Sequence, residues 1–139
     1  MIRRVAWTVA MIGVIACNSN SNDTVAVTTG TYVATSFSTT INGQAAVNQL
    51  TNGSSLSITI NSDGSTTGQL VLVGGAEGGG TLTASMAGTW TQSGSTLTLT
   101  QSADTFVRDL TFTITGNKLI ASATFTDSQL QVTLTRSGS

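Results

Sequence analysis

The stretch Ser-Leu-Ser-Ile-Thr-Ile at residues 55–60 decides the fold of this chain, because apolar and small polar residues alternate along it without a break. Side chains of a β-strand point alternately to its two faces, so this stretch predicts a strand with one face in a core and one in water. The same alternation recurs at residues 97–100, 110–115 and 130–135. No segment has the apolar spacing typical of a helix, so we predict an all-β protein.

Short segments rich in Asn, Asp, Gly and Ser separate the alternating runs. Residues 61–64 (Asn-Ser-Asp-Gly), 93–95 (Ser-Gly-Ser) and 115–117 (Thr-Gly-Asn) favour tight hairpin turns. Such connections join neighbouring antiparallel strands, which predicts an up-and-down barrel or a sandwich, and a barrel has the advantage of removing exposed strand edges. We expect eight strands, at about residues 30–39, 54–61, 66–74, 81–92, 95–101, 106–115, 118–126 and 129–136.

The composition fits an uncharged polar exterior. Charged residues make up 8% of the chain, against roughly 25% in typical soluble domains. Threonine and serine take their place, with 27 and 17 copies, and threonine suits a pleated surface because of its branched Cβ. The few basic residues do not form the clusters that phosphate binding requires, so we expect no nucleic-acid partner. The single cysteine excludes an internal disulfide.

The N-terminus has the layout of a secretory signal. Arg3-Arg4 precedes an apolar run at residues 5–15 that is too short to span a bilayer. The end of this run and the two residues after it, Val14-Ile15-Ala16-Cys17, resemble the lipobox of bacterial lipoproteins. This resemblance implies cleavage before Cys17 and attachment of lipid, such as palmitate, to the mature N-terminus. Asn18 stands where an aspartate would imply retention at the inner membrane, so we expect an anchor in the outer membrane.

Two simpler explanations of Cys17 stay open: an incidental residue in an uncleaved membrane anchor, or a chance cysteine beside an ordinary cleavage site. A lone thiol in an exported chain needs an explanation, and acylation supplies one. A single acyl chain anchors only marginally, so stable attachment needs several chains. We therefore divide the chain into a signal peptide (1–16), a lipidated cysteine with a flexible linker (17–29) and a barrel domain (30–139).

The barrel domain resembles the lipocalin-like barrels of small bacterial lipoproteins. The residues that carry the resemblance are Gly30-Thr31-Tyr32, Ile41-Asn42-Gly43, Asn61-Ser62-Asp63-Gly64, Gly88-Thr89-Trp90 and the late Arg136. Tyr32 stands where lipocalins carry a tryptophan, and the Gly-x-Trp of this chain lies in its middle. The resemblance implies an eight-stranded antiparallel up-and-down barrel, which is wide enough to be filled by side chains or to hold one small apolar ligand.

Tyr32, Trp90 and Arg136 are the residues that we expect to close the barrel. The strand at 30–37 should pair antiparallel with the strand at 129–136, which brings Tyr32 and Arg136 together at the barrel mouth. A guanidinium group there can lie over an aromatic ring, of Tyr32 or Trp90, and still reach water. We therefore expect Arg136 to pack against a ring.

Apolar residues of one parity form the predicted interior. Those that would line a ligand pocket are Leu56, Ile58, Leu70, Leu72, Trp90, Leu97, Leu99, Phe112 and Leu134. Small residues such as Ala34, Gly68 and Ala121 leave room inside, unless they accommodate large rings from across the core. Interiors are close-packed by default. A connected cavity of a few hundred Å³ would support ligand binding, and a packed interior would support a structural role.

Catalytic chemistry has few candidates in this chain. It has no histidine, and its one cysteine belongs to the anchor, which excludes Ser-His and Cys-His catalysis and zinc sites built on these residues. No spacing brings two carboxylates together as an acid–base pair. Asp63 is typical of a hairpin turn, and Glu77 lies among glycines at a hairpin tip. We expect no enzyme activity, no metal and no cofactor.

Arg108 leaves two alternatives. It shares the parity of Leu110 and Phe112, which would point it inward at a barrel mouth. A strand end is exposed to water in any case, so the shared parity could equally be accidental.

Two functions fit this sequence. The first is a non-enzymatic, lipid-anchored envelope protein whose barrel shelters a small apolar molecule. The second is a structural or interaction module with a solid barrel, whose outside meets a protein partner that the sequence does not identify. An integral outer-membrane barrel is disfavoured, because the apolar residues keep a single parity and the chain has only seven aromatic residues.

Overall fold

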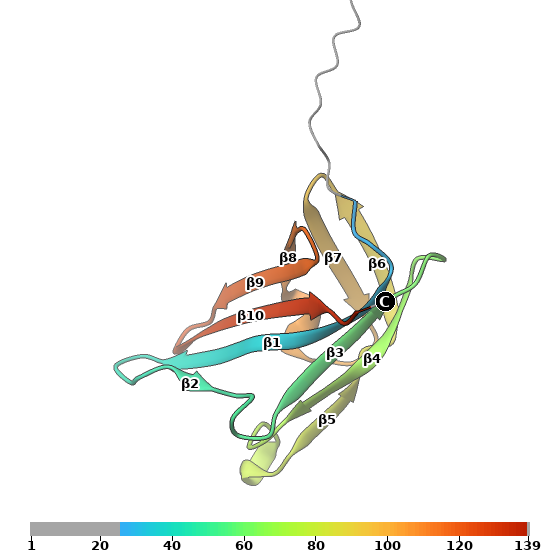
Figure 1. Cartoon of the computed structure of the whole chain (residues 1–139). Coiled ribbons are helices and arrows are strands. Elements are labelled where there is room, and N and C mark those ends of the chain that lie inside the picture. The colour runs from blue at the N-terminus through green and yellow to red at the C-terminus, as the bar shows by residue number, and fades with distance from the viewer. Residues whose placement is uncertain (1–25, 139) are drawn as a thin grey trace, which may run out of the picture.

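The computed structural model describes residues 26–138, so the predicted signal peptide, Cys17 and the linker up to residue 25 lie outside the described residues. Strands form nearly all of the regular structure, with two short 3-10 helices, η1 and η2 (Figure 1). In chain order the elements are β1 (Gly30–Ile41), β2 (Val47–Asn48), β3 (Ser55–Ile60), β4 (Ser65–Leu72), η1 (Glu77–Gly79), β5 (Leu82–Ser85), β6 (Gly88–Ser93), β7 (Thr96–Gln101), η2 (Phe106–Asp109), β8 (Thr111–Thr115), β9 (Lys118–Thr124) and β10 (Ser128–Arg136).

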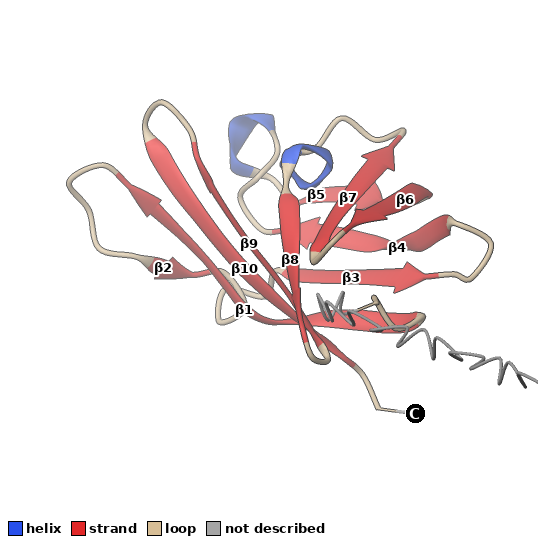
Figure 2. Cartoon of the chain, turned by 90° about the horizontal axis from the view of Figure 1, so that it is seen from above, coloured by secondary structure: helices blue, strands red, loops and turns tan. Residues whose placement is uncertain are grey.

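Eight of the strands close into an antiparallel barrel. Its order is β1, β3, β4, β6, β7, β8, β9 and β10, and β10 pairs with β1 to complete the ring. Figure 2 shows β1, β9 and β10 on one side of the barrel and β3, β4 and β5 on the other. The short strand β2 pairs with β1, and the short strand β5 pairs with β4. The predicted up-and-down barrel is therefore confirmed, and the alternative of an open sandwich is wrong.

The seam between β1 and β10 has the predicted antiparallel pairing. Its register runs from Tyr32 opposite Arg136 to Ile41 opposite Ser128, with one shift at Thr35 between Ala34 and Ser36. A bulge of this kind adds a residue to one strand and changes which positions face inward. Tyr32 and Ala34 are buried before the bulge, and Phe37 is buried after it. Strict alternation along β1 would have placed Phe37 on the outside.

The predicted strand at 81–92 is interrupted. The structure divides it into β5 and β6, with Met86 and Ala87 between them. Each part pairs with a different half of β4, and Met86 is fully buried at the break. Gly68 and Gly88 flank this bend, where a Cβ would collide with the carbonyl oxygens of Ser57 and Thr100. The two glycines therefore allow backbones to approach closely where the sheet turns.

The predicted strand at 106–115 is wrong in its first part, because residues 106–109 form η2 and the strand begins only at Thr111. The Thr105 side chain caps this helix by accepting a hydrogen bond of 3.3 Å from the backbone N–H of Val107. Val107 and Leu110 are buried, and the ring of Phe106 lies 6.0 Å from that of Phe37. The segment therefore packs its apolar side chains into the end of the barrel.

The folded part of the chain begins before Gly30. Val27 is buried, and its backbone N–H donates a hydrogen bond of 2.9 Å to the side-chain oxygen of Gln92 on β6. The carbonyl groups of Thr28 and Thr29 accept hydrogen bonds from Tyr32 and Arg136. The last residues of the predicted linker thus pack on the barrel.

Replacing Leu110 by Ala tests whether the η2 segment belongs to the core. Leu110 is 1% exposed, so we expect the free energy of unfolding to fall by about 2–5 kcal/mol, the usual cost of such a truncation. Ile120→Ala on β9 is the matched control, because Ile120 is 40% exposed and its truncation should cost less than about 1 kcal/mol. Urea unfolding curves of both variants measure the difference. Equal losses would contradict the packing of the segment at 106–110 into the core.

Candidate functional site

The barrel has two ends that differ in composition. The N-terminal rim is the end where the described chain begins, and it consists of residues 26–30, the turns 61–64, 93–95 and 116–117, and residues 136–138. The far rim is the opposite end, and it consists of the connections 42–46, 73–81, 102–110 and 125–127. Antiparallel pairing places these segments, because each connection between neighbouring strands lies at one end or the other.

The predicted pocket-lining residues fill the barrel. Seven of them are at most 2% exposed: Leu56, Ile58, Leu70, Leu97, Leu99, Phe112 and Leu134. Leu72 and Trp90 are half-buried and pack against this core. No pocket is found within residues 26–138. These side chains therefore face inward, as their parity predicts, and they pack against one another.

Several interior residues were missed by sequence reasoning. Val27 precedes the predicted domain, Phe37 follows the bulge in β1, and Met86 occupies the break between β5 and β6. Val107 lies on η2, in a segment that was predicted as strand. Bulges and breaks reset the alternation, and no local residue pattern marks where they occur. Leu119 is a further buried residue that was missed. It is the one member of this group that follows simple alternation, because its neighbours Lys118 and Ile120 are exposed.

Tyr32 and Arg136 meet at the N-terminal rim, but their contact differs from the predicted one. The buried Tyr32 hydroxyl donates a hydrogen bond of 2.7 Å to the Thr28 carbonyl, and Arg136 Nε donates one of 3.1 Å to the Thr29 carbonyl. The guanidinium group lies against Gly30, where an added Cβ would be 2.8 Å from Nε. Phe37 with Phe106 is the only ring contact within residues 26–138. The predicted packing of Arg136 on a ring is therefore wrong.

Burial raises the pKa of the Tyr32 hydroxyl above its usual value. The positive charge of Arg136 offsets part of that rise. Arg136 thus acts on Tyr32 through its charge, while its hydrogen bond joins the end of β10 to the segment before β1.

Trp90 contributes to a different part of the barrel. Its indole Nε1 donates a hydrogen bond of 2.8 Å to the Asn61 carbonyl, and its backbone N–H donates one of 2.9 Å to the Gly64 carbonyl. These bonds tie β6 to the turn between β3 and β4. Trp90 therefore lies at the N-terminal rim but away from the seam between β1 and β10.

Arg108 is exposed and points away from the core. Its Nη2 lies 2.7 Å from Asp104 Oδ1, and its Nε lies 3.8 Å from Asp109 Oδ1. Both partners are exposed, so these ion pairs contribute little to stability. The inward alternative for Arg108 is wrong, because the residue belongs to η2 and strand parity does not apply there.

Asp63 forms the predicted turn. Its Oδ1 accepts hydrogen bonds from the Ser65 hydroxyl at 2.6 Å and from the Ser65 backbone N–H at 2.9 Å. These two bonds lower the pKa of the carboxyl group below its usual value, because they stabilise the ionised form. The carboxylate is thus engaged by its own hairpin.

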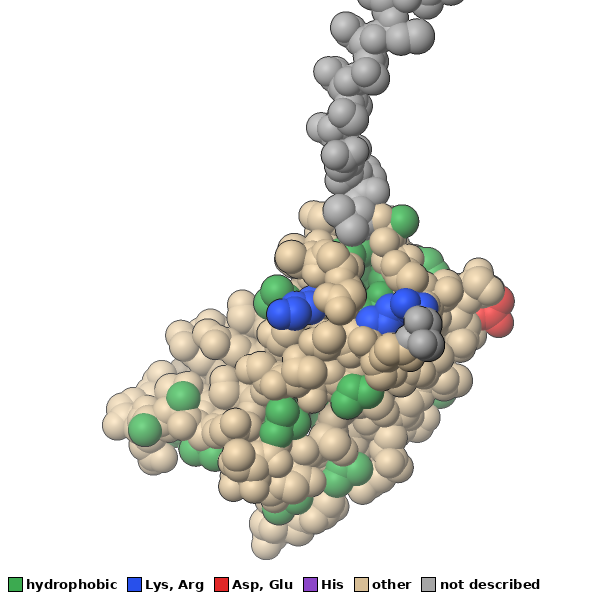
Figure 3. All heavy atoms as spheres, in the orientation of Figure 1, with side chains coloured by type: hydrophobic (Ala, Val, Ile, Leu, Met, Phe, Trp, Pro, Cys, Tyr) green, Lys and Arg blue, Asp and Glu red, His purple; other side chains and the backbone are tan. Residues whose placement is uncertain are grey.

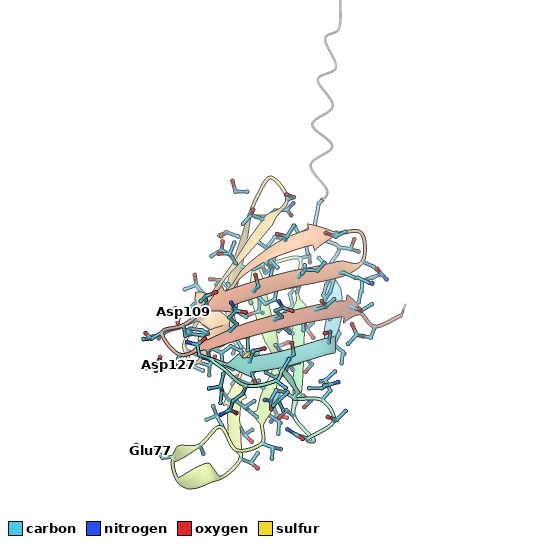
Figure 4. All side chains as sticks on the ribbon, turned by 90° about the vertical axis from the view of Figure 1, so that its left-hand side faces the viewer. Glu77, Asp109 and Asp127 are labelled. Atoms are coloured by element: carbon cyan, nitrogen blue, oxygen red, sulfur yellow. The ribbon has the colours of Figure 1, made fainter. Side chains whose placement is uncertain are left out.

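The far rim combines acidic and apolar side chains. Glu77, Asp109 and Asp127 are exposed there, at edges of the molecule away from the start of the described chain (Figure 4). Ile41 and Phe125 are 52% and 41% exposed at the same end. No group of three His, Cys, Asp or Glu side chains converges within residues 26–138. The far rim is therefore marked by exposed acidic and apolar side chains. Within residues 26–138 it brings no set of reactive groups together.

Comparisons with known proteins add no relative. No family model matches the chain, and no curated protein and no solved structure matches it either. None of the helices in residues 26–138 is long and apolar enough to cross a membrane.

Removal of the Asp63 carboxylate should weaken the hairpin in a pH-dependent way. A lowered pKa means that the stabilisation is complete above the unfolded value of about 4 and is lost as the pH falls through the folded value. Asp63→Ala should therefore melt at a lower temperature than the parent at pH 7, and the two should converge at about pH 2. Asp127→Asn on the far rim serves as the control. A difference for Asp63→Ala that persists in acid would show that the charge is not responsible.

Proposed function

We propose that this protein is a lipid-anchored component of a bacterial cell envelope, and that its barrel is a solid module that acts through its outer surface. The filled interior carries this proposal. Seven of the nine side chains expected to line a pocket are at most 2% exposed, and no pocket is found in residues 26–138. Ligand pockets usually enclose about 300–1,000 Å³, so a small apolar ligand would require the core to rearrange.

The anchor is supported by the N-terminal sequence. A basic start, an apolar run and Val14-Ile15-Ala16-Cys17 occur in the order that lipoprotein processing requires. The described domain begins nine residues after Cys17, which leaves room for a linker. Asn18 favours the outer membrane. The membrane, reached through the N-terminal lipid, is therefore one partner, and another envelope component is the second.

A non-enzymatic role fits the distribution of polar groups. Arg108 is paired with Asp104, and Asp63 is engaged in its own turn. The chain contains no histidine to act as a base near neutral pH. A lipidated Cys17 would have no free thiol. These features favour an interaction module over a catalyst.

Replacing Cys17 by Ser tests the anchor. We expect the wild-type chain to fractionate with membranes as a processed form that carries lipid, and Cys17→Ser to lose the lipid and accumulate unprocessed. Ser19→Ala, two residues further on, is the matched control and should behave as wild type. Cell fractionation with mass spectrometry of the N-terminal peptide measures both properties. Identical processing and partitioning of Cys17→Ser would refute lipidation.

Native mass spectrometry tests the solid interior. The chain from Asn18 onward, purified without denaturation, should give the mass of the protein alone, because the core leaves no pocket for an apolar guest. The same sample, unfolded and extracted with organic solvent, should release no stoichiometric lipid. A co-purifying fatty acid at one copy per chain would instead establish the ligand-binding function.

A further inference from the structure

The charged residues of the barrel are segregated between its two rims. Lys118 and Arg136 lie at the N-terminal rim, at the start of β9 and the end of β10, with Asp63 as the acidic residue there. The far rim holds the other charged residues described in 26–138, which are Glu77, Asp104, Arg108, Asp109 and Asp127. By count, the N-terminal rim carries 2 − 1 = +1 and the far rim carries 1 − 4 = −3.

The two basic residues are close neighbours. Lys118 pairs with Thr135, the residue before Arg136, and the Arg136 backbone N–H donates a hydrogen bond to Asn117, the residue before Lys118. Lys118 is exposed and forms no ion pair within residues 26–138. Figure 3 shows Lys and Arg side chains on this face beside the point where the described chain begins.

The position of this rim relative to Cys17 is constrained by the length of chain between them. Cys17 and Ala26 are nine residues apart, so their separation is at most about 30 Å. Val27 is fixed against Gln92 at the N-terminal rim. The twelve residues of β1 span about 40 Å along the strand, which runs toward the far rim at a tilt to the barrel axis. A lipid on Cys17 therefore keeps the N-terminal rim within about 30 Å of the membrane, whereas the far rim can lie farther away.

We propose that the N-terminal rim is a contact surface for anionic phospholipid headgroups, with Lys118 and Arg136 as its binding residues. This inference rests on the proposed lipid anchor, which brings the rim within reach of the membrane. Each basic side chain near an anionic leaflet favours contact by roughly fivefold. The acidic far rim opposes the inverted orientation. The barrel consequently stands upright and presents its far rim to other envelope components.

Trp90 provides a native reporter for the test. It is the sole tryptophan of the chain from Cys17 onward, and its bond to Asn61 places it at the N-terminal rim. That chain is coupled through Cys17 to a maleimide lipid in vesicles that contain a headgroup-attached nitroxide quencher. A second chain carries Trp90→Phe with Phe125→Trp, which moves the reporter to the far rim.

Quenching is compared between neutral phosphatidylcholine vesicles and vesicles with one-third phosphatidylglycerol. We expect Trp90 quenching to rise at least about twofold with the anionic lipid and to lose this rise in molar salt, where screening extends only about 3 Å. The far-rim reporter should show no rise. Lys118→Glu should abolish the rise for Trp90, whereas Arg108→Glu, the same change in net charge at the far rim, should preserve it.

Equal quenching of Trp90 on neutral and anionic vesicles would overturn the proposal, as would an undiminished rise in Lys118→Glu. Because the attachment is chemical, neither outcome depends on lipidation in the cell. The fractionation of Cys17→Ser tests that step separately, so a failed anchor and a failed contact surface are distinguishable.

Discussion

The pairing of β1 with β10 is the interaction on which the rest of the structure depends. Their residues are about a hundred positions apart. Closing so long a loop costs conformational entropy, which is compensated only when many contacts form together. The seam supplies them, since its register runs from Tyr32 opposite Arg136 to Ile41 opposite Ser128. Closure removes two exposed edges, and it brings the start and the end of the domain to the same rim.

The interior is filled because neighbouring backbones lie close together and the sheet bends at one place. Gly68 and Gly88 let neighbouring backbones approach closely, and the break at Met86 bends the sheet at the same place. Toward the far rim the ladders around β6 and β7 are short, and η2 supplies Val107 to the core where strand pairing has ended. The interior is thus occupied from both ends by the chain itself. This filled interior is the observation that supports the proposed role of the outer surface.

That outer surface is mostly uncharged. Threonine and serine cover the strands, while the charged side chains of residues 26–138 gather at the two rims. Among the described residues, no other charged group masks the contrast between Lys118 with Arg136 and the acidic far rim. The charge of the barrel therefore differs between the two ends of its long axis. The described chain begins at the basic end.

The sequence by itself determined the class of fold and most of the interior. Alternation with period two depends only on strand geometry, so the inward orientation of residues such as Leu56 and Ile58 could be predicted locally. The pairing of the first and last strands also followed, because an up-and-down sheet with one apolar face closes most simply on itself. The Asp63 turn was predictable for a similar reason, since its hydrogen bonds are to a residue two positions away.

Only the tertiary structure decided the features that depend on distant partners. The bulge at Thr35, the break at Met86 and the helical turn at 106–109 are set by how curved strands meet. These features interrupt the strand alternation, so Phe37 and Val107 are buried and Arg108 is exposed. The partner of Arg136 was decided in the same way, by the carbonyl of Thr29 and the space over Gly30. Whether inward side chains enclose a cavity is also a tertiary property, because parity gives direction and only packing across the barrel gives volume.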